Sequence, residues 1–298
     1  MAAHSGLLGW ILTRTNRVDH APAVAKHRKP DDVILTNAEK LQRLGFRFGV
    51  NGPHAARTMM LEELRALLSA TGDVPSRTDY AAAIVDDNVL GKPTRRARLL
   101  TLRHMSALYD LDTTNPIFRA LRRLWRLNDD AQPILALAMA LARDPLLRGT
   151  QDFICTQAIG TAVPREAVER LIAQTHQDRF SRASLKSFAQ NVAGTWTAAG
   201  LLAGHRNKVR SKPPAYPESM TFLLFLGYLD GRTGQRLFSS EWTALLGASP
   251  DELAALANTA AHRGLLVFMN AGGVTEVRFP GYLSSEEERI RQDLAHVV

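Results

Sequence analysis

The chain contains a single cysteine, Cys155, among its 298 residues. One cysteine excludes an intramolecular disulfide and a zinc site built from several thiolates, and it indicates a reducing compartment, so we expect a cytoplasmic protein. Long apolar runs are also lacking. The longest run, at 133–142, is about half the ~20 residues that a membrane span requires. It predicts a buried helix, and we expect no membrane partner.

Signatures of catalysis are missing as well. The sequence has no Gly-rich loop with P-loop or Rossmann spacing, no His-Glu-x-x-His and no Gly-x-Ser-x-Gly. Asp86 and Asp87 are paired acids, but no further acid and lysine follow at a recognisable spacing, which favours a helix end over a metal site. His104, His176 and His205 are isolated, and each is interpreted as an ordinary polar residue. The sequence therefore predicts no enzyme, no metal and no cofactor.

Positive charge, in contrast, is in excess. The chain has 37 Lys and Arg against 29 Asp and Glu, which gives a net charge of +8 at pH 7 and a pI of about 10.0. Proteins that bind nucleic acid neutralise phosphates with Lys and Arg and release counterions, so this excess favours double-stranded DNA as a partner. A soluble protein with a mildly positive surface is the alternative, and composition alone leaves it open.

The first two thirds of the chain have a helical pattern. Apolar residues recur at steps of three and four from Ala38 onward. Turn residues at 49–53 separate the two helices of a first pair, and turn residues at 88–91 separate the two helices of a second pair. This predicts a helix-turn-helix-like N-terminal part. We expect four regions: a weakly ordered basic arm at 1–38, a helical domain at 39–203, a basic linker at 204–217 and a winged-helix-like domain at 218–298.

The C-terminal third changes pattern. After a short helix at 241–246, Ser249 and Pro250 provide the N-cap and first-turn proline of a helix that extends to His262. Two β-rich runs, 265–269 and 274–279, follow around an Asn/Gly turn and predict a hairpin. Helix, helix and hairpin in this order are typical of a winged helix. The predicted fold class is therefore mainly α and multi-helical, with a C-terminal winged-helix-like domain that contains one β-hairpin.

The second helix of this predicted domain has a composition that is unusual for a DNA reader. Winged-helix proteins commonly place this helix in the major groove. Here it begins with Asp251 and Glu252 and has no basic residue before Arg263 except His262, whereas Arg, Lys, Asn and Gln are the usual base-contacting residues. This composition favours a structural or protein-contacting wing over one that reads DNA.

Two clusters of basic residues are the candidate DNA-binding sites. Their members are Lys92, Arg95, Arg96 and Arg98, at the beginning of a helix capped by Thr94, and Arg206, Lys208, Arg210 and Lys212, at alternate positions after a helix expected at 184–202. The first cluster lies near helix N–H groups that also attract phosphate. Side chains of an extended segment alternate between its two sides, so the second cluster would form a cationic strip on one side.

Each cluster has an alternative interpretation that the sequence leaves open. The first is also what a solvated charged helix face looks like, and the second is also compatible with a flexible hinge. Trp196 precedes the second cluster, but Phe188, Val192 and Ala199 share its helical spacing. This spacing favours a core position for Trp196 over a platform for base stacking.

Three segments resemble the BrxA family of BREX bacteriophage-exclusion systems. They are IVDDNVLGKPTRRAR at 84–98, LARDPLLR at 141–148, and FSRASLKSFAQN at 180–191 with its continuation at 195–202. The resemblance spans about 61–280. It implies a small, mostly helical, non-enzymatic component of a phage-defence operon, which binds DNA and acts together with larger methyltransferase and ATPase partners.

The primary hypothesis is therefore a DNA-binding accessory component of a bacterial phage-defence system, which holds duplex DNA mainly through non-specific phosphate contacts of the two basic clusters. A protein-interaction scaffold that docks a partner subunit through its winged domain is the rival. A metal-dependent nuclease that uses Asp86 and Asp87 is a third possibility.

Overall fold

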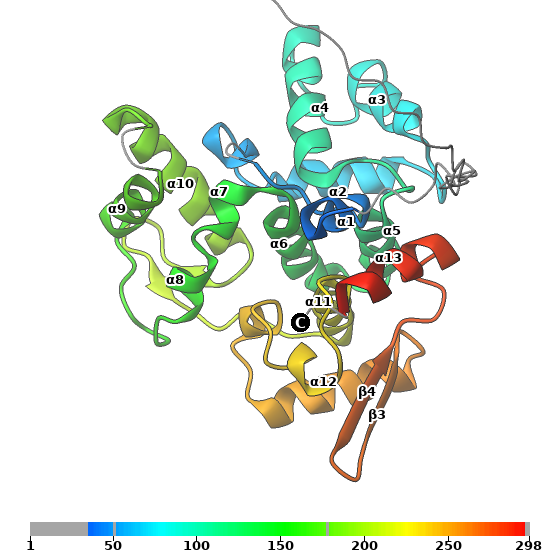
Figure 1. Ribbon diagram of the computed structural model, residues 1–298. Coiled ribbons are helices and arrows are strands. Elements are labelled where there is room, and N and C mark those ends of the chain that lie inside the picture. The colour runs from blue at the N-terminus through cyan, green and yellow to red at the C-terminus, as the bar shows by residue number, and fades with distance from the viewer. Residues whose placement is uncertain (1–34, 50–51, 177–178, 296–298) are drawn as a thin grey trace, which may run out of the picture. The chain divides into compact units, whose positions relative to one another are not determined.

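Helices dominate the computed structural model, which describes residues 35–49, 52–176 and 179–295 (Figure 1). The longer helices are α1 (Asn37–Arg43), α2 (Leu61–Ala70), α3 (Arg77–Val85), α4 (Arg95–Tyr109), α5 (Pro116–Trp125), α6 (Gln132–Arg143), α9 (Arg165–Thr175), α10 (Arg182–Ala198), α11 (Pro217–Leu229), α12 (Pro250–His262) and α13 (Ser285–Ala295). Short helical segments are η1 (Pro53–Ala55), η2 (Asp129–Ala131), α7 (Pro145–Arg148), α8 (Gln151–Cys155), η3 (Gly234–Leu237) and η4 (Thr243–Leu246). Strands β1 (Leu202–Ala203) and β2 (Val209–Arg210) form one antiparallel pair, and β3 (Val267–Ala271) and β4 (Val274–Arg278) form another. The predicted mainly α fold is confirmed.

The predicted basic arm at 1–38 lies almost entirely outside the described residues, and Asn37 and Ala38 at its end already belong to α1. The described residues form one unit by their mutual contacts. The expected finer division into regions at 39–203, 204–217 and 218–298 stays a prediction.

The helices begin where the local sequence provides acceptors. At the start of α4 the Thr94 hydroxyl accepts a hydrogen bond from the Ala97 N–H at 3.1 Å. At the start of α12, Ser249 and Glu252 cap each other reciprocally, with Pro250 in the first turn. Such acceptors satisfy N–H groups that have no partner inside the helix. The predicted beginnings of both helices are confirmed.

Two apolar helices, α6 and α11, lie at the centre of the described residues. Every residue at 134–142 of α6 is buried, and nearly the whole of α11 is buried too. Helices α4, α5, α10 and α11 all contact α6. The apolar run at 133–142 is therefore the buried helix that the sequence predicts. Within the described ranges, no helix is both long enough and apolar enough to cross a membrane.

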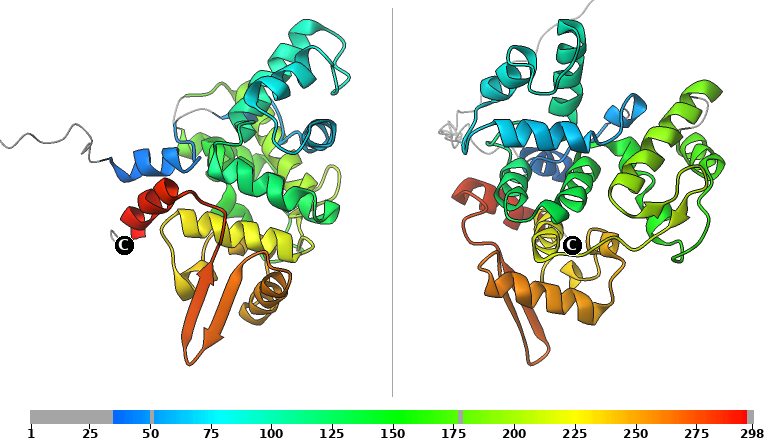
Figure 2. Two further views of the ribbon diagram at one scale, coloured as in Figure 1. Left: turned by 90° about the vertical axis from the view of Figure 1, so that its right-hand side faces the viewer. Right: turned by 180° about the vertical axis from the view of Figure 1, so that it is seen from behind.

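Three groups of elements surround these central helices (Figures 1 and 2). They are the α3–α4 pair, the α9–α10 pair with β1 and β2, and α12 with the β3–β4 hairpin, which projects from the molecule. Each group places a different helix surface toward solvent. Each of these three surfaces is therefore a candidate for the interface with a partner.

Helix α10 is shorter at its C-terminus than the sequence predicts. The apolar spacing suggests a helix to Leu202, but α10 ends at Ala198, and Leu202 belongs to β1. Gly200 has a φ of +80°, a left-handed conformation that glycine adopts without strain, and the Leu201 N–H bonds back to the Trp196 carbonyl at 3.0 Å. This glycine turn directs the chain into the β1–β2 pair.

The C-terminal hairpin forms close to the predicted position. Strand β3 begins at Val267 rather than at Leu265, because the Leu265 N–H bonds back to the Ala260 carbonyl at 3.0 Å and closes the end of α12. Leu265 and Leu266 are both buried. The turn consists of Gly272 and Gly273, whose φ angles of +60° and +80° are left-handed. Two successive positive φ angles match the twist of a two-residue hairpin turn.

A buried network of polar side chains joins three distant segments. The Asp144 carboxylate accepts hydrogen bonds from the N–H and from Nδ1 of His54, both at 2.8 Å, and the other ring nitrogen of His54 lies 2.8 Å from the Thr195 hydroxyl. That hydroxyl also accepts from the Met59 N–H at 2.9 Å. Its own proton is then directed to Nε2, which leaves the ring proton on Nδ1, facing Asp144. The network thus connects η1, the end of α6 and α10.

Asp144 has a second structural role. Its Oδ1 accepts from the Leu146 and Leu147 N–H groups, which caps α7. Burial alone would raise the pKa of Asp144, but the hydrogen bonds from His54, together with the Leu147 N–H, outweigh burial and hold the pKa below its ordinary value. A Cβ at Gly52 would lie 1.7 Å from Oδ1 of Asp144, so only glycine fits there.

We predict that Asp144→Asn lowers the free energy of unfolding by about 3 kcal/mol or more, because an amide N–H₂ would face the two donors of His54. Denaturant unfolding measures this loss. Asp152→Asn, an exposed change on α8, is the control and should leave stability within about 0.5 kcal/mol of wild type. Equal losses in the two variants would contradict the role of the network.

The same variant gives a pH dependence with a defined sign. Since the folded pKa of Asp144 is depressed, its contribution is complete above the ordinary aspartate pKa of 3.8 and is lost as the pH falls below that value. The stability difference between wild type and Asp144→Asn should therefore be constant near neutral pH and shrink below about pH 4.

Candidate nucleic-acid interface

The four basic residues of the first predicted cluster lie at or just before the start of α4, and two of them, Lys92 and Arg98, are engaged by neighbouring parts of the protein. Lys92 pairs with Glu63 at 3.0 Å, and Arg95 lies 3.6 Å from an Asp86 carboxylate oxygen. Arg98 donates to the backbone carbonyl of Val85. The fourth member, Arg96, is exposed, and no described residue pairs with it. The cluster therefore offers one uncommitted cation and one exposed, weakly held pair.

The paired acids are in keeping with a helix end. Asp86 is the C-cap of α3 and faces Arg95, and Asp87 follows it at the exposed end of the helix. Among residues 35–49, 52–176 and 179–295, no three His, Cys, Asp or Glu side chains lie close enough together to hold a metal ion.

Arg210 has to be removed from the predicted cationic strip. Its side chain is buried, and its guanidinium donates to the backbone carbonyls of Ile154, Leu201 and Ser211. Burial lowers the pKa of Arg210 from its ordinary value. The predicted alternation fails because only Val209–Arg210 of this run is strand. Arg210 lies in the interior, whereas Arg206 and Lys212, at alternate positions of the same run, are exposed. Arg210 holds β1, β2 and the end of α8 together and cannot reach a phosphate.

Lys212 is exposed, but its charge is neutralised by an acid from a distant part of the sequence. Its Nζ lies 2.9 and 3.0 Å from the two carboxylate oxygens of Glu252, at the start of α12. The hydrogen bond from Lys212 and those from Ser249 lower the pKa of Glu252 to about 2. The ion pair connects the segment after β2 with the C-terminal group of elements.

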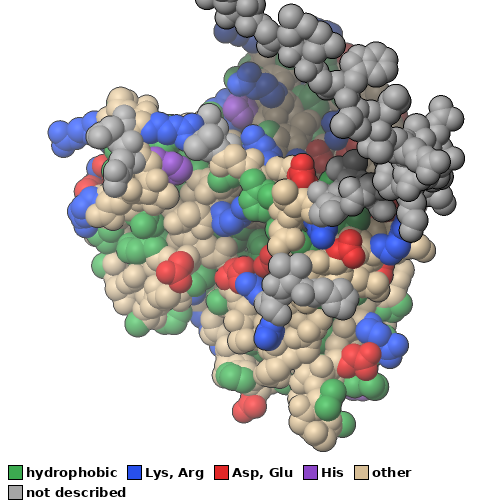
Figure 3. All heavy atoms as spheres, viewed as in Figure 1, with side chains coloured by type: hydrophobic (Ala, Val, Ile, Leu, Met, Phe, Trp, Pro, Cys, Tyr) green, Lys and Arg blue, Asp and Glu red, His purple; other side chains and the backbone are tan. Residues whose placement is uncertain are grey.

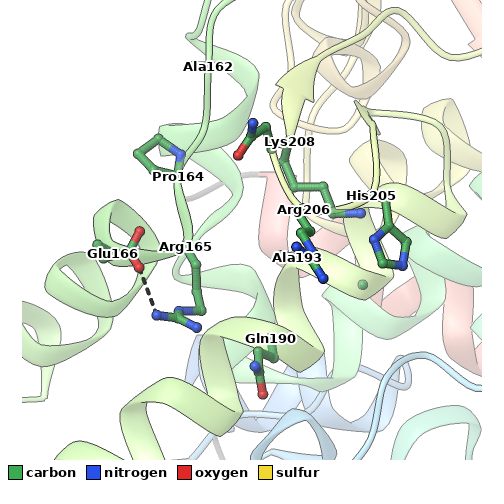
Figure 4. Close-up of a pocket in the computed structure, with 11 residues that line it drawn as sticks. Ala162, Pro164, Arg165, Glu166, Gln190, Ala193, His205, Arg206 and Lys208 are labelled. Atoms are coloured by element: carbon green, nitrogen blue, oxygen red, sulfur yellow. Dashed lines mark hydrogen bonds and ion pairs between the residues drawn. The ribbon is translucent and has the colours of Figure 1, made fainter.

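The remaining two residues of the strip, Arg206 and Lys208, lie on the loop at 204–208 between β1 and β2. Together with His205 they line one wall of a cavity of about 680 Å³, and Gln190 of α10 lies on the facing side (Figure 4). Lys208 Nζ donates to a carbonyl of the same loop at 2.6 Å. Arg206 is exposed, and no partner for it is found in the described part of the chain.

A second arginine borders the cavity from the start of α9. Arg165 pairs with Glu166 at 2.7 Å (Figure 4). It also pairs with Glu169 at 2.7 Å. Its charge is therefore compensated within α9. The positive potential of the cavity originates from the loop at 204–208.

Helix α10 has one buried and one polar face. Phe188, Val192 and Trp196 point into the core, and the Trp196 indole N–H donates to the Thr150 hydroxyl at 3.0 Å, so Trp196 is a core residue as expected. The opposite face consists of exposed Arg182, Ala183, Lys186, Ser187 and Gln190. Figure 3 shows Lys and Arg side chains gathered over the α9–α10 end of the molecule.

Sequence reasoning missed this outer face of α10, although a signal was present. Arg182, Lys186 and Gln190 recur every four residues, which places them in one row along a helix. The apolar residues of the same helix form the stronger pattern, and that pattern predicts only the buried face.

The strands beside α10 form a small sheet. On one side β2 pairs with β1, and on the other it is bridged to Ala162, with the Val163 N–H donating to the Lys208 carbonyl at 2.8 Å. The segment around Ala162 therefore lies beside β2, with β1 on the other edge. In chain order, α8, this segment, α9, α10, β1 and β2 follow one another, and the basic loop lies between the last two.

The Thr195, His54 and Asp144 network has the residue types of a nucleophile, base and acid. All three side chains are fully buried. The Thr195 hydroxyl also accepts from the Met59 N–H, so a lone pair needed for attack is occupied. The arrangement therefore stabilises the fold.

No family model matches the chain, and no curated protein is found to be similar to it. Function is therefore inferred from the geometry of α10 and its neighbouring loop.

We predict that the same substitution changes the stability of the protein strongly at Arg210 and hardly at all at Arg206, four residues away. Arg210→Met should lower the free energy of unfolding by about 3 kcal/mol, because three carbonyls lose a charged donor. Arg206→Met should change it by less than about 0.5 kcal/mol. Denaturant unfolding of both variants tests this, and similar stabilities would contradict the assignment of Arg210 to the interior.

Proposed function

We propose that this protein binds duplex DNA with α10 and the loop at 204–208, as a non-enzymatic accessory protein. The observation that carries the proposal is the exposed polar and basic face of α10 beside a loop that presents Arg206 and Lys208. Helix and loop border one cavity (Figure 4). A helix of this kind fits the major groove, while basic side chains on an adjacent loop contact the phosphates.

The order of elements supports this proposal. Helix, short strand, helix, helix and two paired strands, with the last strand in the middle, are typical of winged-helix domains. The group from α8 to β2 has this order, and the loop at 204–208 occupies the position of the wing. We therefore propose a winged-helix-like DNA-binding unit here, ahead of the C-terminal one that the sequence suggests.

The cluster at the start of α4 is a secondary part of the proposed interface. Arg96 is exposed. Arg95 can exchange Asp86 for a phosphate, because the ion pair between Arg95 and Asp86 is exposed to solvent and therefore weak. Lys92 and Arg98 are engaged by Glu63 and by the Val85 carbonyl. Duplex contacts at this end would then be fewer than at α10, and the overall charge of +8 would attract DNA from a distance.

The biological setting follows from the resemblance to the BrxA family. We propose a cytoplasmic accessory component of a phage-defence system that acts on DNA together with methyltransferase and ATPase partners. The mainly helical fold is compatible with this role.

A protein-interaction scaffold is the second candidate, and a specific observation favours it. Met269 and Val274, on the strands that flank the tip of the β3–β4 hairpin, are 52% and 68% exposed. The neighbouring α12 begins with the exposed Asp251, which would repel DNA, whereas the charge of Glu252 is balanced by Lys212. The C-terminal group, α12 with the β3–β4 hairpin, thus has an apolar tip suited to a partner subunit.

We predict that Arg206→Glu/Lys208→Glu weakens binding to a random-sequence duplex by about tenfold or more and lowers the slope of log affinity against log salt by roughly 2, since two phosphate contacts are lost. Titration of a labelled duplex at several salt concentrations measures both quantities. Arg236→Glu/Arg278→Glu, at exposed positions in the C-terminal group, removes the same net charge and should have a much smaller effect. If the two double variants bind equally, the loop is not the interface.

For the scaffold, we predict that a partner encoded by a neighbouring gene co-purifies with the full chain after nuclease treatment. Met269→Ser/Val274→Ser should abolish this capture, whereas Arg206→Glu/Lys208→Glu should not, because apolar contacts do not depend on phosphate. Capture that disappears with nuclease would count against the scaffold.

A further inference from the structure

The outer face of α10 is built differently from a surface that binds only phosphate. Phosphate binding needs cations, whereas this face combines Arg182 and Lys186 with Gln190 and with the small side chains of Ala183 and Ser187. Arginine, lysine and glutamine are the residues that make paired hydrogen bonds to base edges. Small neighbours allow the helix backbone to approach the floor of a groove.

The three long side chains of this face are uncommitted. Among the described residues, none donates to or pairs with Arg182, Lys186 or Gln190, in contrast to the members of the α4 cluster. Asn191, one position further along, is held by the His54 carbonyl at 3.0 Å and belongs to the structural side of the helix. The boundary between the anchored and the free side of α10 thus falls between Gln190 and Asn191.

The helix that presents these side chains is fixed rigidly. Thr195 is tied to His54 and to the Met59 N–H, and Trp196 is tied to Thr150. Phe188 packs edge-on against Phe180 with ring centroids 4.9 Å apart. A rigid helix holds its outer side chains at constant separations, as the discrimination of bases requires.

We propose that α10 recognises a specific DNA sequence in the major groove, with Arg182, Lys186 and Gln190 contacting base edges, while Arg206 and Lys208 hold the adjacent phosphates. This inference rests on the proposed function and differs from it in one respect: phosphate contacts alone would make binding independent of sequence. Gln190 lies at the junction, since it shares a cavity with the loop at 204–208 (Figure 4).

The spacing on the helix sets the spacing expected on the DNA. Eight residues separate Arg182 from Gln190, which corresponds to about 12 Å along a helix that rises 1.5 Å per residue. With about 3.4 Å per base pair, the two side chains span roughly three to four base pairs. Arginine and lysine favour guanine, and glutamine favours adenine. The expected site therefore has a guanine and an adenine separated by about this distance.

The test is a selection of duplexes from a random library by the full-length protein, followed by affinity measurements on the selected duplex and on a scrambled one. We expect an enriched motif with fixed guanine and adenine positions. Gln190→Ala should lower the ratio of the two affinities about tenfold or more, and Arg182→Ala should do the same at a different position of the motif.

Matched controls separate base reading from general effects. Gln174→Ala removes an exposed glutamine from α9, and Arg236→Ala removes an exposed arginine from η3, so both should leave the ratio unchanged. Arg206→Glu/Lys208→Glu should weaken binding to both duplexes similarly and preserve the ratio. Binding without an enriched motif, or a motif that survives Gln190→Ala and Arg182→Ala, would overturn this inference and leave the proposed function standing. Absence of any duplex binding at low salt would overturn both.

Discussion

The structure depends on the buried carboxylate of Asp144. Its two oxygens accept four hydrogen bonds, two from His54 and two from the first turn of α7, and His54 in turn reaches Thr195 on α10. An unpaired buried carboxylate would be strongly unfavourable, so the chain segments that supply these donors are held in place together. This carboxylate positions the inner side of α10, and the candidate interface lies on the outer side of the same helix.

The helical architecture could largely be predicted from the sequence because its signals are local. Apolar spacing predicts α6, and Ser249 with Pro250 predicts the beginning of α12. The His54 network could not be predicted, since its partners lie 90 and 141 residues away along the chain. The β1–β2 pair was also missed, because two-residue strands are too short to show an alternating pattern.

For the candidate site, the sequence identifies charged residues but not their partners. Glu252 neutralises Lys212, and Glu63 neutralises Lys92, yet neither acid is close to its partner in sequence. The prediction of one cationic strip assumes an extended segment from 206 to 212, whereas only Val209–Arg210 is strand, so the four basic side chains do not share one side. Arg210 was assigned to the surface for this reason, whereas it lies in the interior. Arg206 and Lys208 are the members of the strip that the structure leaves on a solvent-facing loop.

The loop at 204–208 also has a consequence for the entropy of association. Its ends are closed by the β1–β2 pair and by Arg210, and Gly204, at a φ of +94°, leaves no room for a side chain because a Cβ would lie 2.3 Å from the Asn207 carbonyl oxygen. The loop has therefore lost most of its conformational freedom during folding. A ligand that contacts Arg206 needs to order little more than one side chain, so more of the interaction free energy is retained as affinity.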